Sequence, residues 1–550
     1  MTTNTPLSIR SVRLGAMPII DKYIALLGIE PLFQRHVSSD PRDKIPVFDC
    51  LSIVLRNVIL DRHPLYKIGE WAIQRELVSS ALAESFNDDR IGRALDRLFA
   101  ADRASLISEV VLNAIKVFNI DLSRIHNDST TVTLFGDYDD YEDVTSVKPR
   151  HGHNKDHRPD LKQLVFSLSV AGDHAVPLHF KAWDGNVTDD TTHVRNWMSL
   201  RRLIGTSDFV YVADSKLCVR DTLQFITAEG GSFVTVIPQT RSEIGQFQQW
   251  IQNNNPDWQK AIDEPNPRKK GSERRQFWTC DSPFRSSEGY RIIWVKSLAK
   301  QQDDCLRRTN RLELCQDALT KLSAKPHKNR DKLESSVKLI LQANNSKEYY
   351  DWQVVEDTEE TFKQESRGRP DETTKYKKIE KTVYRLSFAQ NGQKIAFDAS
   401  YDGIFPLITN RTEPAKRILE MYKYQPNLEK RFEQLKSVYN VAHVFLQNPQ
   451  RIEALLTIYF ISMLITSLVE RSVRQEMEAR GLKSIPIYPE KRECKSPTAD
   501  KLFMLFDDVR LQFVCENHKV LSTVPDELSK VQKLVLVLIG IKPQKFFMTG

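Results

Sequence analysis

Residues 209–214 read FVYVAD, and this short stretch decides the fold class of the chain. Phe209 to Ala213 form an unbroken apolar run, which is typical of a central strand buried on both faces. Three segments with strand character precede this run, and a helical segment and a further strand follow it. Three strands followed by alternation with helices predict a mixed α/β sheet with helices on both faces. The three preceding strands are expected at residues 124–135, 162–172 and 175–183.

Two aspartates occupy informative places in these strands. Asp214 ends the apolar run, and ligand sites of open α/β sheets lie beyond the carboxyl ends of such strands. Asp128 shares one face of the first strand with Thr130, Val132 and Leu134, because side chains alternate with a period of two. An aspartate on a mostly apolar face needs a partner or a metal ion. Taken alone, an aspartate at a strand end is more often a turn or cap residue, so both are candidates.

A helix with one charged edge is expected at residues 425–439, QPNLEKRFEQLKSVY. Pro426 suits only the first turn of a helix, so the helix should begin near Gln425, with Tyr422 in the preceding loop. Glu429 and Lys436 are seven residues apart and, at roughly 100° per residue, share one stripe. An amphipathic surface helix is the ordinary interpretation of such a stretch. Its apolar stripe comprises Leu428, Phe432, Leu435 and Tyr439.

The chain is long enough for several domains, and its patterns change character along its length. Residues 1–120 are predicted to form an N-terminal all-α domain. Residues 121–241 and 399–475 are predicted to form the two parts of the sheet-bearing domain. Between them, residues 242–398 are predicted to form an insertion with strands and a helical hairpin. Residues 476–550 are predicted to form a helical tail, with dimerisation as its candidate role.

Composition indicates a protein that meets phosphates in a reducing compartment. Lys and Arg (79) exceed Asp and Glu (72), giving a net charge of +7 and a pI of about 8.8. The seven cysteines form no C-x-x-C pair, which argues against a disulfide framework and favours the cytoplasm. Residues 452–469 are nearly long and apolar enough to span a membrane. We expect a buried core helix there and no membrane partner.

The order of three acids resembles a known arrangement. Asp128 within the first strand, Asp214 at the end of the fourth and Glu429 on a helix after an insertion are placed as in ribonuclease H-like polynucleotidyl transferases. The helix also resembles the signature of a large group of bacterial insertion-sequence transposases: Tyr, two residues, Arg, three residues, Glu, six residues, Lys. Tyr422, Gln425, Glu429 and Lys436 stand at those spacings, with Gln425 in place of Arg.

Further landmarks of that family occur in order along nearly the whole chain. They include RLGAMPIIDKY and NDDRIGRALDRLF near the N-terminus, HNDSTTVTLFG, GHNKDHRPDLKQ, GNVTDDTTH, VADSKL, YDGIFPLITN and YPEKRECKSPTADKLF. The chain therefore resembles a DDE transposase of the subgroup with a β-rich insertion domain and the Y-R-E-K signature.

The resemblance implies an enzyme that binds the terminal inverted repeats of its element as a homodimer on the nucleoid, with residues 1–120 as the domain that recognises these DNA ends. It would hydrolyse the phosphodiester at each end and join the freed 3′ hydroxyl to target DNA. Asp128, Asp214 and Glu429 would hold two Mg²⁺ ions, or Mn²⁺, because hard divalent cations prefer carboxylates. Lys436 and Tyr422 would contact the DNA backbone. Gln425 would be a further DNA contact, although an amide lacks the charged fork with which Arg binds phosphate.

The insertion carries basic and aromatic residues that suit DNA. One run, RKKGSERR, contains Arg268, Lys269, Lys270, Arg274 and Arg275. The tetrapeptide RGRP places Arg367 and Arg369 as in a minor-groove hook, since narrow A·T-rich grooves attract Arg; a solvated loop is the alternative. Trp278, Trp294 and Trp352 either stack on bases or belong to the core of a small sheet.

Several groups have ordinary interpretations. His126 is expected to pack within the sheet, and the histidines of residues 151–157 are expected in a basic loop rather than in a closed four-ligand zinc site. Glu433 lies about 40° round the helix from Glu429 and is expected to face solvent or pair with a base. Two other functions share the fold: a nuclease without strand transfer, and a DNA-binding transposition inhibitor without catalysis.

Overall fold

The computed structural model describes residues 7–138, 145–266, 274–439, 446–488, 490–516 and 519–548. The chain divides into two compact units. The main unit comprises residues 1–235, 409–411 and 420–550, and the insertion unit comprises residues 236–408 and 412–419. The insertion unit therefore starts earlier and ends later than the predicted 242–398. The main unit contains the predicted N-terminal and C-terminal segments and most of the two predicted catalytic segments.

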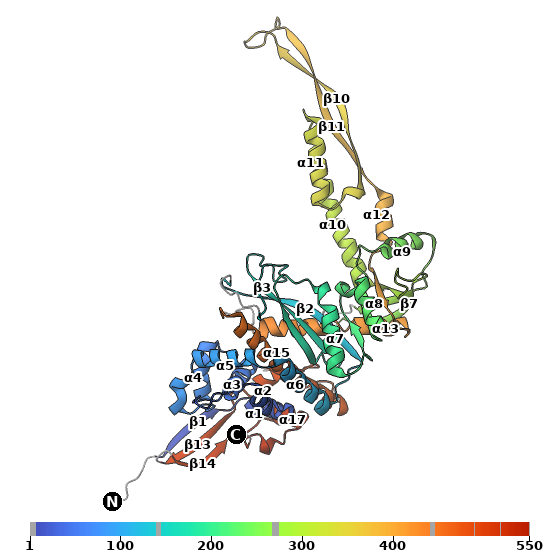
Figure 1. The fold of residues 1–550 in the computed structure, drawn as a ribbon. Helices are drawn as coiled ribbons and strands as arrows, with labels where there is room; N and C mark the ends of the chain where they lie inside the picture. The colour runs from blue at the N-terminus through green and yellow to red at the C-terminus, as the bar shows by residue number, and fades with distance from the viewer. Residues whose placement is uncertain are drawn as a thin grey trace, which may run out of the picture. The chain divides into compact units, whose positions relative to one another are not determined.

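A mixed sheet lies at the centre of the main unit (Figure 1). Its strand order is β4-β3-β2-β5-β6; β2 pairs with β3 and β3 with β4 antiparallel, whereas β2 pairs with β5 and β5 with β6 parallel. Every residue of β3 is buried, so both faces of the sheet are covered there. The predicted mixed α/β sheet is confirmed. Its strands are β2 (Arg124–Thr133), β3 (Gln163–Ala171), β4 (Pro177–Trp183), β5 (Val210–Val212) and β6 (Ser232–Val236).

Helices cover this sheet and continue into a helical layer. The strands β4, β5 and β6 are linked through α7 (His193–Ile204) and α8 (Arg220–Ala228), and α6 and α7 both contact β4. The long helix α15 (Pro449–Ala479) contacts β4 as well as α1, α3, α5 and α6. The N-terminal helices are α1 (Met17–Leu27), α2 (Ile29–His36), α3 (Val47–Leu60), α4 (Ile68–Gln74), α5 (Asp88–Ala100) and α6 (Arg103–Phe118).

The apolar run at residues 452–469 forms part of the helix α15. Within the described residues it alone is long and apolar enough to cross a membrane, and 89% of its most apolar window is buried inside the fold. The run at 452–469 is therefore satisfied by protein neighbours, as a core helix requires. The helix begins at Pro449 and ends at Ala479.

The two ends of the chain meet in a small antiparallel sheet of order β1-β13-β14 (Figure 1). It consists of β1 (Ser8–Arg13), β13 (Arg510–Glu516) and β14 (Lys519–Pro525). The prediction of an all-α N-terminal segment and a purely helical tail is thus corrected. Only Val12 of β1 is buried, so this strand exists because of its distant pairing partner and not because of its own apolar pattern.

The insertion unit contains strands and a helical hairpin. In it, β8 pairs antiparallel with both β7 and β9, and β12 lies beside β9 in the strand order. The helices α10 and α11 form the charged hairpin predicted from the sequence, interrupted at residues 324–329. The elements are α9 (Ser242–Asn253), β7 (Gln259–Pro265), β8 (Arg274–Asp281), β9 (Arg291–Ser297), α10 (Leu298–Ser323), α11 (Arg330–Ala343), β10 (Tyr350–Gln364), β11 (Tyr376–Gln390), α12 (Gly392–Ala399) and β12 (Ile404–Thr409).

Candidate active site

Asp128 lies on β2, and Asp214 follows the end of the adjacent parallel strand β5. The register of β2 and β5 pairs Ile125 with Tyr211 and His126 with Val212. Two residues beyond His126 and Val212 come Asp128 and Asp214. Residues in register on parallel strands point to the same face, and neighbouring strands lie about 4.8 Å apart. Continued for two residues beyond the end of β5, this register brings Asp128 and Asp214 near each other at the carboxyl end of β5.

The electrostatics of the two aspartates agree with this placement. Burial raises the pKa of Asp128 to about 7; the Lys155 ammonium opposes this shift, and the negative charge of Asp214 adds to it. Burial also raises the pKa of Asp214, while the backbone N–H of Lys216 acts in the opposite direction. Two neighbouring carboxylates in a poorly solvated place favour a shared proton or a bound cation.

Lys155 and Asp189, which were not predicted as site residues, lie beside Asp128 and Ser129. The Lys155 Nζ lies 3.9 Å from Asp128 Oδ1 and 3.2 Å from Asp189 Oδ2, and it donates to the Ser129 carbonyl at 2.6 Å. Asp189 also accepts a hydrogen bond from the Ser129 hydroxyl. Lys155 and Asp189 belong to the segments GHNKDHRPDLKQ and GNVTDDTTH, and the charged residues of these segments were the sequence signal that could have identified them.

The helical region around Glu429 consists of two α-helices and a π-helical turn. Tyr422 ends α13 (Ala415–Tyr422), so its expected place in a loop is corrected. Pro426 is the first residue of α14 (Pro426–Glu433), where its missing N–H costs no hydrogen bond. The helix α14 contacts β2. The expected apolar stripe is buried in full, namely Leu428, Phe432, Leu435 and Tyr439.

Glu429 is exposed in the first turn of α14, and Tyr422 relates it to the two aspartates. Burial raises the pKa of the Tyr422 hydroxyl to about 12, and the negative charges of Asp214, Glu429 and Asp128 add to the shift. All three acids therefore lie close enough to the Tyr422 hydroxyl to act on it by charge. Nevertheless, the described residues contain no group of three or more His, Cys, Asp or Glu placed to hold a metal ion. Asp128 and Asp214 come together, and Glu429 lies nearby without closing a three-ligand cluster.

The structure corrects the expected role of Gln425 as a DNA contact. Gln425 is buried, its Nε2 donates to the Asn127 carbonyl at 3.0 Å, and its Oε1 lies 3.0 Å from His126 Nδ1. Burial lowers the pKa of His126 to about 4, so the ring is neutral at pH 7. A neutral amide suits this place better than Arg. Gln425 joins the start of α14 to the strand segment that precedes Asp128.

Lys436 lies in a π-helical turn, η6 (Gln434–Val438). The Lys436 Nζ forms an ion pair with Asp156 Oδ1 at 2.5 Å, and Asp156 Oδ2 accepts from the Thr133 hydroxyl at 2.8 Å. The α-helical step of about 100° applies only as far as Glu433, because a π-turn contains more residues per turn. The predicted common stripe of Glu429 and Lys436 is therefore interrupted, and Lys436 faces the loop that follows β2.

The basic residues of the insertion that were predicted to bind DNA differ in their surroundings. Arg268, Lys269 and Lys270 lie outside the described residues. On β8, Arg274 pairs with Asp263 at 2.5 Å and Arg275 with Glu264 at 3.3 Å, so both charges already have partners. Arg367 and Arg369 are exposed in the loop between β10 and β11.

Two of the three tryptophans belong to the core of the insertion unit. Trp294 is fully buried, with its ring centroid 3.7 Å from that of Phe247, and Trp352 packs on a buried cluster of the helical hairpin. Trp278 is partly exposed. Trp294 and Trp352 therefore follow the core interpretation, and a base-stacking role is corrected for Trp294.

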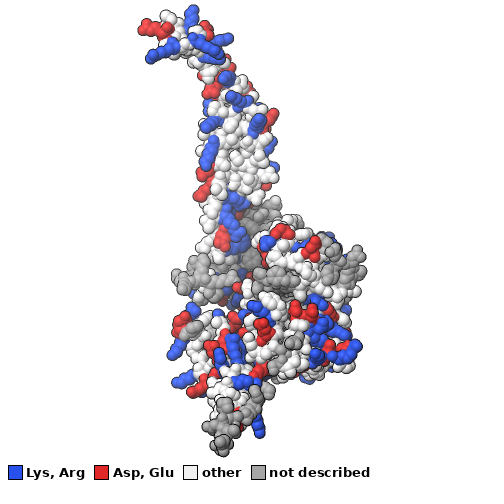
Figure 2. Space-filling view, turned by 90° about the vertical axis from the view of Figure 1, so that its left-hand side faces the viewer, with Lys and Arg blue, Asp and Glu red and all other residues white. Residues whose placement is uncertain are grey.

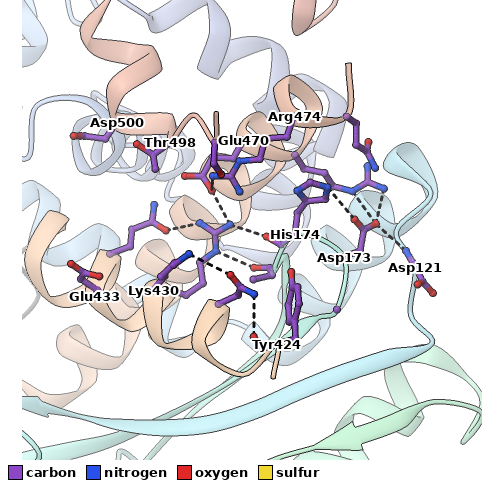
Figure 3. A pocket seen from close by; sticks show the side chains of 18 of the residues that line it. Asp121, Asp173, His174, Tyr424, Lys430, Glu433, Glu470, Arg474, Thr498 and Asp500 are labelled. Atoms are coloured by element: carbon purple, nitrogen blue, oxygen red, sulfur yellow. Dashed lines mark hydrogen bonds and ion pairs between the residues drawn. The ribbon is translucent and has the colours of Figure 1, made fainter. Parts of the chain in front are cut away.

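A cavity of about 1090 Å³ lies at the other end of β2, where Arg124 contributes to its wall (Figure 3). Its charges are largely paired with one another. The Arg431 guanidinium donates to the carbonyls of Ala175 and His174 at 3.0 Å each and pairs with Glu470 at 3.0 Å. The cavity is a structural junction of α14, α15 and the β3–β4 turn. Glu433 is exposed at its wall, consistent with the expectation for this residue.

Comparisons with known proteins give a short family match and two distant structures. Residues 9–112 match a family described as Domain of unknown function (DUF4277). No curated protein gives a significant match. The chain is similar to the piggyBac transposase in a synaptic complex with hairpin DNA, at 10% identity over 88% of this chain and 76% of that chain, with a TM-score of 0.35. A pre-cleavage Mos1 transpososome matches at 12% identity over 34% and 59%, with a TM-score of 0.13. Both TM-scores are low, and function is therefore inferred from this chain's own residues.

Proposed function

We propose that the chain is a DDE transposase with a ribonuclease H-like catalytic unit, which cleaves DNA at the ends of its element and joins the 3′ hydroxyl to target DNA. The observation that carries the proposal is the pair Asp128, on β2, and Asp214, just after the adjacent parallel strand β5, which are partly withdrawn from water and act on each other by charge. Glu429 follows on a helix that contacts β2, at the signature spacing from Tyr422 and Lys436.

The neighbouring carboxyl groups of Asp128 and Asp214 have the oxygen ligands that a divalent metal ion such as Mg²⁺ prefers. The raised pKa values of Asp128 and Asp214 mean that their negative charges are poorly compensated in the protein alone, and a cation between them favours both ionised forms. Asp128, Asp214 and Glu429 would hold the ions, Glu429 through a change of rotamer of its exposed side chain. Two bound Mg²⁺ or Mn²⁺ ions would supply activation of the attacking oxygen and stabilisation of the leaving 3′ oxygen.

The surrounding side chains position the acids and the DNA. The Tyr422 hydroxyl stays protonated at neutral pH because its pKa is about 12, so it can donate a hydrogen bond to a phosphate oxygen. Lys155 holds Asp128 and Asp189 by charge and anchors itself on the Ser129 carbonyl. Lys436, now paired with Asp156, would exchange that carboxylate for a DNA phosphate. These contacts hold the phosphodiester beside the acids.

The partners in this proposal are the terminal inverted repeats and target DNA. Because two ends must be held together for joining, the active species would be a homodimer on DNA.

A strand-transfer assay tests the function. The full chain is incubated with Mg²⁺, a duplex carrying the element's own terminal repeat, and a supercoiled target plasmid; joined products are expected. Asp214→Asn is the control and should bind the end without cutting it. Cleavage without joined products would identify a nuclease instead, and end binding without cleavage by the unaltered chain would identify an inhibitor.

A further inference from the structure

The insertion unit carries an unusually long two-stranded hairpin. The strands β10 and β11 pair antiparallel from Tyr350 opposite Gln390 to Gln364 opposite Tyr376. At about 3.4 Å per residue, 15 residues per strand correspond to roughly 50 Å. Figure 1 shows the hairpin running beside α11 and continuing past it. Only part of the ribbon therefore has a helix to pack on.

The base of the hairpin is anchored, and the distal half is not. Tyr350, Trp352, Val354, Leu386 and Phe388 pack on a cluster formed with α10 and α11. Beyond these residues most side chains of both strands are exposed, including Phe362 at 67% and Tyr376 at 51%. A two-stranded ribbon is marginally stable in water, so the distal half is a segment whose ordering a bound partner would favour.

Charged side chains in the stem of the hairpin form ion pairs, whereas the basic side chains of the tip form none among the described residues. In the stem, Lys378 pairs with Glu360 at 2.6 Å and with Glu380 at 2.9 Å, and Arg385 pairs with Asp357 at 2.8 Å. The tip, residues 363–377, contains three acids and five bases. The acids are Glu365, Asp371 and Glu372; the bases are Lys363, Arg367, Arg369, Lys375 and Lys377.

Two features concentrate positive charge at the tip. Lys363 lies directly opposite Lys377 in the register, and like charges in that position repel. Asp371 is occupied within the loop, where its carboxylate accepts from the backbone N–H of Thr373 at 3.0 Å and from the Thr374 hydroxyl at 3.0 Å. Within the described part of the chain the five bases of the tip form no ion pair. Figure 2 shows charged side chains gathered at this end of the hairpin.

We propose that the tip of this hairpin is a second DNA-binding site, which inserts Arg367 and Arg369 into the minor groove of A·T-rich duplex while Lys363 and Lys377 contact the flanking phosphates. The inference rests on the proposed function for its partner, which is DNA. Narrow A·T-rich minor grooves concentrate negative potential that attracts Arg, and Lys contacts to phosphate set position without reading sequence.

The backbone of the loop suits a narrow groove. Gly368 separates the two arginines, has a φ of +158° and would have nothing within 4 Å of an added Cβ. This backbone conformation is rare for other residues, and it leaves the segment between the two guanidinium groups without a side chain. The segment Arg-Gly-Arg can therefore approach the floor of the groove closely.

The experiment measures equilibrium binding of the full chain to an A·T-rich and a G·C-rich duplex by fluorescence anisotropy, in EDTA and over a series of salt concentrations. The double variant Arg367→Ala/Arg369→Ala should bind the A·T-rich duplex about tenfold or more weakly and the G·C-rich duplex almost unchanged. Lys363→Gln/Lys377→Gln should weaken both duplexes alike and reduce the salt slope by about 1.8, at roughly 0.9 per phosphate contact.

The matched control is Lys332→Gln/Lys338→Gln, which removes two exposed charges from α11 of the same unit and should leave both affinities unchanged. The inference would be overturned if the arginine variant bound each duplex with the same affinity as the unaltered chain does. A variant that loses self-association while keeping DNA affinity would show instead that the tip binds a second copy of the chain. Asp214→Asn distinguishes the two proposals, because it should abolish cleavage and retain the A·T preference.

Discussion

The aspartate pair of the main unit and the tip of the hairpin are both charged, but they are charged in opposite physical settings. Asp128 and Asp214 are withdrawn from water beside one another, and burial raises both pKa values. The bases of the tip are exposed on a ribbon, where solvent screens their repulsion. Partly buried charges that are held close can change protonation state and bind an ion, whereas exposed charges gain mainly by meeting an extended polyanion.

Replacing an acid of the aspartate pair should reduce end cleavage far more than replacing an acid of the hairpin tip. Asp128→Asn or Asp214→Asn should reduce Mg²⁺-dependent end cleavage on the order of a thousandfold, because each removes a proposed metal ligand. Asp371→Asn at the hairpin tip should leave cleavage nearly unchanged. Cleavage rates of single turnovers and end-binding affinities are measured together. If Asp128→Asn loses end binding along with cleavage, the aspartate has a folding role and the comparison fails.

A second comparison concerns two exposed glutamates one turn apart on α14. Glu429→Gln should remove cleavage by about a hundredfold or more, because it takes away the third proposed ligand. Glu433→Gln should remain within a few-fold of the unaltered chain, as expected for an exposed charge. End cleavage of both variants is the measurement. The reverse order would mean that the register of α14, and with it the proposed roles of Tyr422 and Lys436, is wrong.

Titration of Asp128 distinguishes the partly buried pair from exposed charges. Its pKa is about 7 in the folded protein and near the ordinary 3.8 in the unfolded chain. Between those values the unfolded chain has released a proton that the folded protein keeps, so this contribution to stability falls as pH rises from about 4 to about 7. Asp128→Asn should therefore raise the melting temperature above about pH 7 and change it little near pH 4.

Mg²⁺ should act with the opposite pH dependence. Because the ion binds the ionised carboxylate, it should stabilise the unaltered chain more at about pH 8 than at about pH 6. Thermal unfolding with and without Mg²⁺ measures this, and Asp128→Asn serves as the control. A stabilisation by Mg²⁺ that does not vary with pH would contradict the raised pKa of Asp128.

Replacing Gln425, whose amide is buried near the aspartate pair, should give the smallest change. Gln425→Arg places a charge beside the neutral His126, so it should lower the free energy of unfolding by about 1–3 kcal/mol. DNA affinity should not increase, because the side chain stays inside the fold. Urea unfolding and end binding measure the two outcomes. A gain in affinity would show that residue 425 reaches DNA and that its hydrogen bonds to β2 are dispensable.

Periodicity and apolar runs determined a large part of this molecule from the sequence alone. The run at 209–213 specified a buried strand, and the order of strands and helices specified a mixed sheet. The stripe of Leu428, Phe432 and Leu435 specified which side of α14 is buried, and the run at 452–469 specified a core helix. Each of these follows from residues that are close in sequence, because burial on one face or on all sides requires a local repeat.

Tertiary structure alone decided which distant groups meet. β1 became a strand only through β13, Lys155 came to lie between Asp128 and Asp189, and Gln425 turned inward to His126. The π-turn at Gln434–Val438 also displaced Lys436 from the stripe that an ideal helix predicts. Pairing partners, charge neighbours and local departures from regular helix depend on contacts between residues far apart in the chain. No local repeat in the sequence encodes these contacts, because they are set by how the whole fold packs.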